Sequence, residues 1–154
     1  MIVCGAGRLG GALLDPLRDA GHRVLAVDFD PRVVESARAA GHTAVYGDVE
    51  DPELPASLPL TTARWVVCTV RRTDVGLGLL HALEHHGFRG GVVLTAHDAR
   101  DAAQLRARGA HHVLRPYEAA AAEAVAQLTS AAGDVAPRSS AMGPGDLCVA
   151  QLDA

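Results

Sequence analysis

The stretch CGAGRLGGALLDPL, residues 4–17, decides the fold of this chain, because it places Gly5, Gly7 and Gly10 in the spacing G-x-G-x-x-G. In a turn between a strand and a helix, the first glycine permits a tight turn and the second lets a pyrophosphate approach bare backbone. The third lets helix and strand pack closely. The pattern is informative where a strand precedes it, a helix follows it and an acidic residue lies about 20 residues further on.

The flanking sequence meets these three conditions. Residues 2–4 (IVC) predict a short buried strand before the turn. Leucines at every fourth position from Leu9 to Leu17 predict one face of a helix, which Gly21 ends. The next apolar run ends at Asp28, whose carboxylate can accept both ribose hydroxyls of adenosine. The glycine pattern therefore indicates a nucleotide-binding turn.

The composition of the chain limits the other classes of protein to which it could belong. With 154 residues the chain is most simply one domain. Its 14 basic and 18 acidic residues give a net charge of −4, which argues against sequence-independent binding of nucleic acid. Three cysteines without a C-x-x-C pair fit a reducing cytoplasm. We expect neither a signal peptide nor a membrane span, because no apolar run is long enough.

Strand and helix patterns alternate along the rest of the chain. Further strands are expected at residues 43–48, 64–70, 91–96 and 111–116, and further helices at 30–41, 73–87, 97–109 and 117–131. A long connection at 49–63 is expected to hold one helical turn. This alternation predicts an α/β, Rossmann-like, doubly wound parallel sheet of six strands in the order 3-2-1-4-5-6. We expect residues 1–132 to form this domain and residues 133–154, rich in Gly, Pro, Ser and Asp, to form a flexible tail.

Residues 1 to about 130 resemble a KTN/RCK domain, the Trk-type nucleotide-binding domain that regulates potassium channels, potassium uptake systems and Kef-type cation:proton antiporters. The most specific parts of the resemblance are GAGR at residues 5–8, VDFDP at 27–31, and YGD at 46–48 followed by DPELP at 51–55. The run from 79 to 120 is most similar to the cytosolic domain of Kef-type antiporters.

The resemblance implies roles for single residues. Arg8 matches the arginine that reaches the phosphates, Asp28 matches the acid that binds the ribose, and Gly47 with Asp48 match the pair beside the adenine and its ribose. Thr69 and Val70 stand where the family closes the pocket. The expected cofactor-binding residues are Gly5, Gly7, Arg8, Leu9, Gly10, Asp28, Phe29, Asp48, Val49, Thr69, Val70 and Arg71.

The identity of the nucleotide stays open at this point. Asp28 disfavours the 2′-phosphate of NADP, although Arg32 or Arg71 could offset that repulsion. We expect NAD(H), with AMP, ADP and ATP as alternatives. Arg71 and Arg72 depart from the acidic or amide residues that the family often has after its fourth strand, and they are as compatible with a solvated loop as with contacts to an extra phosphate.

A metal site and a redox-active pair of cysteines are weaker alternatives to the nucleotide site. His81 and His85 lie one helical turn apart, but no carboxylate or cysteine at matching spacing supports a metal site, and none is expected. Cys4 and Cys68 fall on strands predicted to be neighbours, where small buried residues explain them better than a redox role does.

The sequence favours a sensor over an enzyme. After the sixth strand it offers one helix and a tail, which leaves nothing to build the substrate domain that hydride transfer usually requires. The resemblance implies a non-catalytic, cytoplasmic regulatory domain at the inner face of the membrane, which binds a nucleotide and gates a cation transporter or channel, in the same chain or as a separate subunit. A small NAD(P)-dependent oxidoreductase and a ligand-free dimerisation platform are the alternatives.

The resemblance also implies a homodimer. The family pairs these domains through helices near the fourth and fifth strands, so residues 74–88, with Leu77, Leu80 and Leu83, are the candidate contact. The alternative is that these leucines only cover the sheet.

Overall fold

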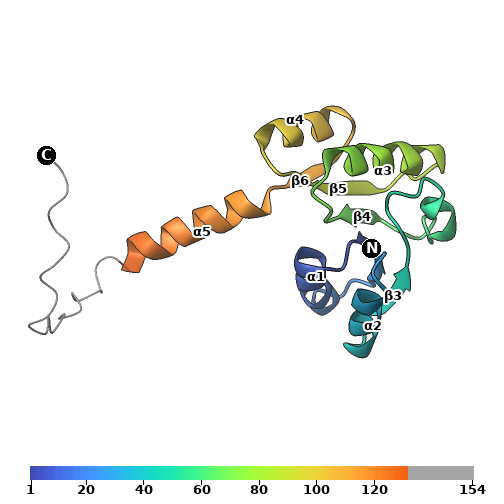
Figure 1. The fold of residues 1–154 in the computed structure, drawn as a ribbon, viewed down its shortest axis with the longest axis horizontal. Coiled ribbons are helices and arrows are strands. Elements are labelled where there is room, and N and C mark those ends of the chain that lie inside the picture. The colour runs from blue at the N-terminus through green and yellow to red at the C-terminus, as the bar shows by residue number, and fades with distance from the viewer. Residues whose placement is uncertain (132–154) are drawn as a thin grey trace, which may run out of the picture. The chain divides into compact units, whose positions relative to one another are not determined.

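The computed structural model describes residues 1–131, in which strands and helices alternate (Figure 1). The strands are β1 (Ile2–Cys4), β2 (Leu25–Asp28), β3 (Thr43–Tyr46), β4 (Trp65–Cys68), β5 (Gly91–Thr95) and β6 (His112–Leu114). The helices are α1 (Arg8–Asp19), α2 (Pro31–Ala39), α3 (Thr73–His85), α4 (Ala99–Ala107) and α5 (Pro116–Ala131), with a 3-10 turn, η1 (Leu54–Ser57), between β3 and β4.

The six strands form one parallel sheet in the order β3-β2-β1-β4-β5-β6. This confirms the predicted α/β, Rossmann-like topology. The order reverses between β1, which pairs with β2 on one side, and β4 on the other. In such sheets ligands bind beyond the carboxyl ends of the strands at this reversal, which is where the glycine turn lies.

Side chains from alternate positions of each strand form two cores. Ile2 and Cys4 of β1 belong to the core that α3 and α4 cover, together with Leu79 and Leu105. Val3 points to the opposite face and packs with helices α1 and α2. Figure 1 shows these two helix pairs on either side of the sheet. The nearly continuous apolar strands follow from burial on both faces.

Residues Met1–Ala119 form one compact unit, and α5 continues from there into a second unit that begins at Ala120. The predicted flexible tail at 133–154 lies outside the described residues. Within residues 1–131, no helix combines the length and the apolar character that a membrane span requires.

Helix α3 carries the leucines considered for a dimer contact. Leu83 is 2% exposed and belongs to the core, while Leu77 and Leu80 are partly buried and pack against that core. These leucines therefore cover the sheet, and Leu77 and Leu80 remain partly exposed.

Two glycines of α3 give a test of this packing. A Cβ at Gly78 would meet nothing within 4 Å, whereas a Cβ at Gly76 would lie 3.1 Å from Leu105 Cδ2 and 3.3 Å from Leu94 Cδ1. We expect Gly78→Ala to raise the free energy of unfolding by about 0.5–1 kcal/mol, the ordinary gain for alanine in a helix. Gly76→Ala should show less of this gain, because the two leucines must shift. Urea unfolding of both variants checks the difference, and equal gains would contradict the packing of α3 on α4.

Candidate nucleotide-binding crevice

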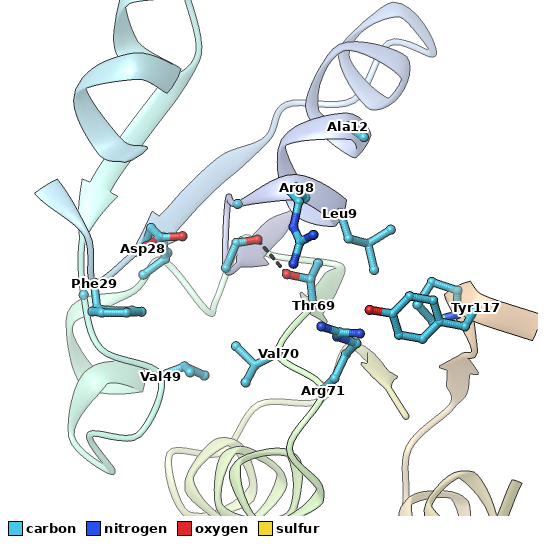
Figure 2. A pocket seen from close by; sticks show the side chains of 15 residues that line it. Arg8, Leu9, Ala12, Asp28, Phe29, Val49, Thr69, Val70, Arg71 and Tyr117 are labelled. Atoms are coloured by element: carbon cyan, nitrogen blue, oxygen red, sulfur yellow. Dashed lines mark hydrogen bonds between the residues drawn. The ribbon is translucent and has the colours of Figure 1, made fainter. Parts of the chain in front are cut away.

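A crevice of about 570 Å³ opens at the carboxyl ends of β1, β2 and β4. This volume lies within the range of typical small-molecule sites. The residues that line it are Gly5, Gly7, Arg8, Leu9, Ala12, Val27, Asp28, Phe29, Gly47, Val49, Thr69, Val70, Arg71, Pro116 and Tyr117. Figure 2 shows Asp28, Phe29 and Val49 at one end of the crevice and Arg71 with Tyr117 at the other.

The turn after β1 is held by close backbone contacts. Gly5 has a φ of +85°, a conformation that favours glycine, and a Cβ there would lie 2.6 Å from the Thr69 hydroxyl. That hydroxyl donates to the Gly5 carbonyl over 2.8 Å, the dashed bond in Figure 2. Gly10 sits beneath the turn, where a Cβ would fall 1.7 Å from the Gly5 carbonyl oxygen. Gly10 is therefore a packing residue and does not line the crevice.

Helix α1 begins at this turn without a cap. No side chain caps its first N–H groups, and its first turn contains no acidic residue. Helices α2 and α4, in contrast, are capped by Asp30 and Asp98. The open N–H groups and the helix dipole favour an anion at the turn. Arg8, the first residue of α1, adds an exposed cation that has no ion-pair partner among residues 1–131.

Asp28 connects the end of β2 to the glycine turn. Its Oδ2 accepts a hydrogen bond from the Ala6 backbone N–H at 2.7 Å, and its Oδ1 accepts one from the Asp30 N–H at 2.9 Å. The residue is 7% exposed and lines the crevice. An ionised carboxylate has about four acceptor positions, so two remain for ligand hydroxyls.

The end of the crevice near Asp28 is apolar. Phe29 is 66% exposed and follows Asp28, and Val49 lies on the facing loop with Gly47. A planar base would gain apolar contact between these side chains. Asp48 does not line the crevice. Its carboxylate instead accepts from the Glu50 backbone N–H and organises the turn after β3.

The two arginines after β4 have different surroundings. Arg71 lines the crevice, and its Cζ lies 4.7 Å from the centre of the Tyr117 ring. Arg72 points elsewhere and pairs with Glu50 and Asp74. Its hydrogen bond lowers the pKa of the Asp74 carboxyl below the ordinary value. Of the two alternatives that the sequence left open for these arginines, the ion pairs of Arg72 favour the solvated loop for that residue.

Tyr117 is the main lining residue that the sequence reasoning missed. It follows β6 as the second residue of α5 and reaches the crevice from there. The sequence does contain a signal for it, because the carboxyl end of β6 lies at the same edge of the sheet as those of the other strands.

Cys4 and Cys68 occupy directly opposed positions on β1 and β4 and are both 0% exposed. Burial raises the pKa of Cys68 to about 11 and raises that of Cys4 as well. Because the raised pKa values favour the protonated thiols in the folded state, their contribution to stability is complete below the ordinary thiol pKa. It is lost as the pH rises through the folded-state values.

We therefore expect neither thiol to react with iodoacetamide at pH 8 in the folded protein, because the thiolate is the nucleophile. Peptide mapping by mass spectrometry distinguishes these two cysteines from Cys148, and labelling in urea is the control. Rapid labelling of native Cys68 would contradict its burial.

A second cavity of about 550 Å³ lies between α1 and α2, with Leu14, Val33 and Ala37 in its wall. His42 Nε2 lies 3.4 Å from Asp15 Oδ1 beside it. In the part of the chain that is described, no three His, Cys, Asp or Glu side chains come together in an arrangement that could hold a metal ion.

Residues 1–116 match the model of the TrkA-N domain family. No curated protein sequence is significantly similar to the chain. Among solved structures, the NAD(P)-binding domain of an exopolyphosphatase-related protein from Archaeoglobus fulgidus is 25% identical with a TM-score of 0.72, over 84% of this chain and 96% of that one.

Two further structures are similar in fold. The Kef CTD of Shewanella denitrificans in its AMP-bound form is 21% identical with a TM-score of 0.74, over 86% of this chain and 81% of that one. The GsuK channel bound to NAD is 18% identical with a TM-score of 0.64, over 75% of this chain and only 21% of the channel chain.

Proposed function

The chain belongs to the TrkA-N domain family, and on that premise we propose that it is a regulatory domain that binds an adenine nucleotide in the crevice at β1, β2 and β4. The ligand adenosine would lie at Asp28, Phe29 and Val49, and its phosphates at Gly7 and Arg8.

The observation that carries this proposal is the double role of Asp28. One carboxylate group holds the Ala6 N–H of the glycine turn and faces the crevice with its remaining acceptor positions. The ribose site and the phosphate site are thus joined by one buried side chain. Beside it, the uncapped start of α1 and Arg8 provide the positive potential that phosphate needs.

NAD(H) is the preferred ligand, with AMP, ADP and ATP as alternatives. The buried carboxylate of Asp28 favours a free 2′-hydroxyl over the 2′-phosphate of NADP. Arg32 does not offset that preference at close range, because Asp30 holds its guanidinium at 2.9 Å. GsuK bound to NAD and the Kef CTD bound to AMP support both kinds of ligand for this fold.

We propose that nucleotide binding regulates the partner by shifting the equilibrium between two arrangements of paired domains. A nucleotide that binds one arrangement more tightly biases the equilibrium by that difference, about 1–3 kcal/mol in typical coupled systems. In this proposal the partner is a cation channel or antiporter in the membrane, with the domain on the cytoplasmic side. Helix α3 supplies the homodimer contact through the surface that Leu77 and Leu80 keep.

A second candidate is a small NAD(P)-dependent oxidoreductase, which the likeness to the NAD(P)-binding domain from Archaeoglobus fulgidus favours. Hydride transfer needs an acid or base beside the nicotinamide. The lining residues within the described part of the chain include no His, Glu or Lys, and Tyr117 beside Arg71 is the side chain that could serve as such an acid. A platform without a ligand is the third candidate.

Isothermal titration of the domain with NADH, NAD, NADPH, ATP and AMP separates these candidates. The proposal predicts micromolar binding of at least one nucleotide without consumption of NADH. Substrate-dependent NADH turnover would favour the enzyme, and no binding by any of the five would favour the platform.

A further inference from the structure

On the basis of the proposed nucleotide site, we propose that the crevice selects nucleotides that carry a 5′-pyrophosphate over nucleoside monophosphates. Arg71, held by Tyr117, is the group that binds the second phosphate. The ligand class is the adenosine 5′-pyrophosphate unit, which ADP, ADP-ribose and NAD share and AMP lacks.

The charged side chains along the crevice favour a ligand with two phosphates. Arg8, Arg71 and Asp28 are the charged residues among those that line it. Figure 2 places Asp28 at the ribose end, Arg8 in the middle and Arg71 at the far end beside Tyr117. One cation is sufficient for a single 5′-phosphate at the glycine turn. The second cation lies further from the ribose, where a second phosphate would extend.

Arg71 and its neighbour Arg72 differ in their ion pairs. Arg72 is bound by both Glu50 and Asp74. Among residues 1–131, Arg71 has an aromatic contact and no carboxylate partner. An arginine without an acidic partner in a crevice keeps its five donors for a ligand, and its planar guanidinium matches a phosphate.

The ring of Tyr117 holds the guanidinium of Arg71 in place. Its Cζ lies 4.7 Å from the centre of the Tyr117 ring. The same ring meets His97 edge to face at 6.3 Å. The loops after β4, β5 and β6 therefore meet at Tyr117. A stack on one face orients the guanidinium and leaves its edge donors free. Tyr117 is in this sense a positioning residue for Arg71.

Titration calorimetry with AMP, ADP, ADP-ribose and NAD tests this proposal on the wild type, on Arg71→Gln and on Arg108→Gln. Arg108 follows α4 at the end of that helix remote from His97, so it controls for the loss of one positive charge. We expect the three pyrophosphate ligands to bind about tenfold more tightly than AMP, the usual value of a charge-assisted hydrogen bond.

In Arg71→Gln, the affinity for ADP, ADP-ribose and NAD should fall about tenfold to the level of AMP, while AMP itself binds as in the wild type. Equal affinities for ADP and NAD would identify the bridging pyrophosphate as the recognised group, and a preference for ADP would identify a terminal phosphate. Equal binding of AMP and ADP by the wild type, or an equal loss for both in Arg71→Gln, overturns the inference and leaves the proposed function intact. No binding of any nucleotide overturns both.

The role of Tyr117 has its own test. Tyr117→Phe keeps the ring and should keep the ratio of ADP to AMP affinity. Tyr117→Leu removes the stack and should lower that ratio about two- to fivefold, as expected for an exposed cation–π contact. Loss of the ratio in both variants, or in neither, overturns the positioning role.

Discussion

Gly10→Ala is expected to destabilise the domain more than any other alanine substitution considered for this chain. A Cβ at this position would fall 1.7 Å from the carbonyl oxygen of Gly5 and 2.8 Å from its carbonyl carbon. Both are backbone atoms of the turn, so no side chain can move aside. We expect the free energy of unfolding to fall by about 3 kcal/mol or more, because overpacking against a fixed backbone costs more than a usual core change.

Urea unfolding followed by circular dichroism measures this loss. Gly78→Ala is the matched control, because it adds the same methyl group to a helix where nothing lies within 4 Å. A Gly10→Ala variant that unfolds at the same urea concentration as the wild type would contradict the close approach of α1 to the turn.

Gly7→Ala should have the second large effect, on ligand binding instead of on stability. A Cβ at Gly7 would meet no protein atom within 4 Å. The added methyl group would occupy the crevice at the uncapped start of α1, where the phosphates are proposed to lie. We expect nucleotide affinity to fall about 10- to 100-fold, from the steric cost of one misplaced methyl group.

Calorimetry with the nucleotide that the wild type binds most tightly measures this effect, and the unfolding midpoint of Gly7→Ala checks that the variant is folded under the conditions of the titration. Unchanged affinity in a folded Gly7→Ala variant would place the phosphates elsewhere. This variant is a sharper probe than Asp28→Ala, which would also leave the buried Ala6 N–H without its acceptor.

The fold could be predicted from the sequence because each of its determinants is local. The three glycines, the leucine spacing of α1 and the apolar strands each specify one element, and parallel strands joined by helices allow few topologies. The predicted strands are longer than the observed ones at their carboxyl ends. β4, expected to reach Val70, ends at Cys68, opposite the last residue of β1, because Gly5 turns the chain away with a φ of +85°.

The site was less predictable because its contacts join residues far apart in the chain. Arg71 and Arg72 are the same residue type, and among residues 1–131 Arg72 alone of the two pairs with Glu50 and Asp74. The signal for Tyr117 is its place just after β6, which becomes informative only once β6 is placed in the sheet. Asp28 was expected to bind ribose, but its bond to Ala6 depends on the three-dimensional turn.

A two-dimensional ¹H–¹⁵N spectrum of the labelled domain, titrated in turn with NADH and ADP, tests most directly whether a nucleotide binds in the crevice at β1, β2 and β4. Binding in the crevice predicts that at least one of them shifts the amide signals of Gly5, Gly7, Arg8 and Phe29, while the signals of Ser36 and Ala37 in the wall of the α1–α2 cavity do not move. Shifts confined to the α1–α2 cavity, or no shift with either nucleotide, would contradict it.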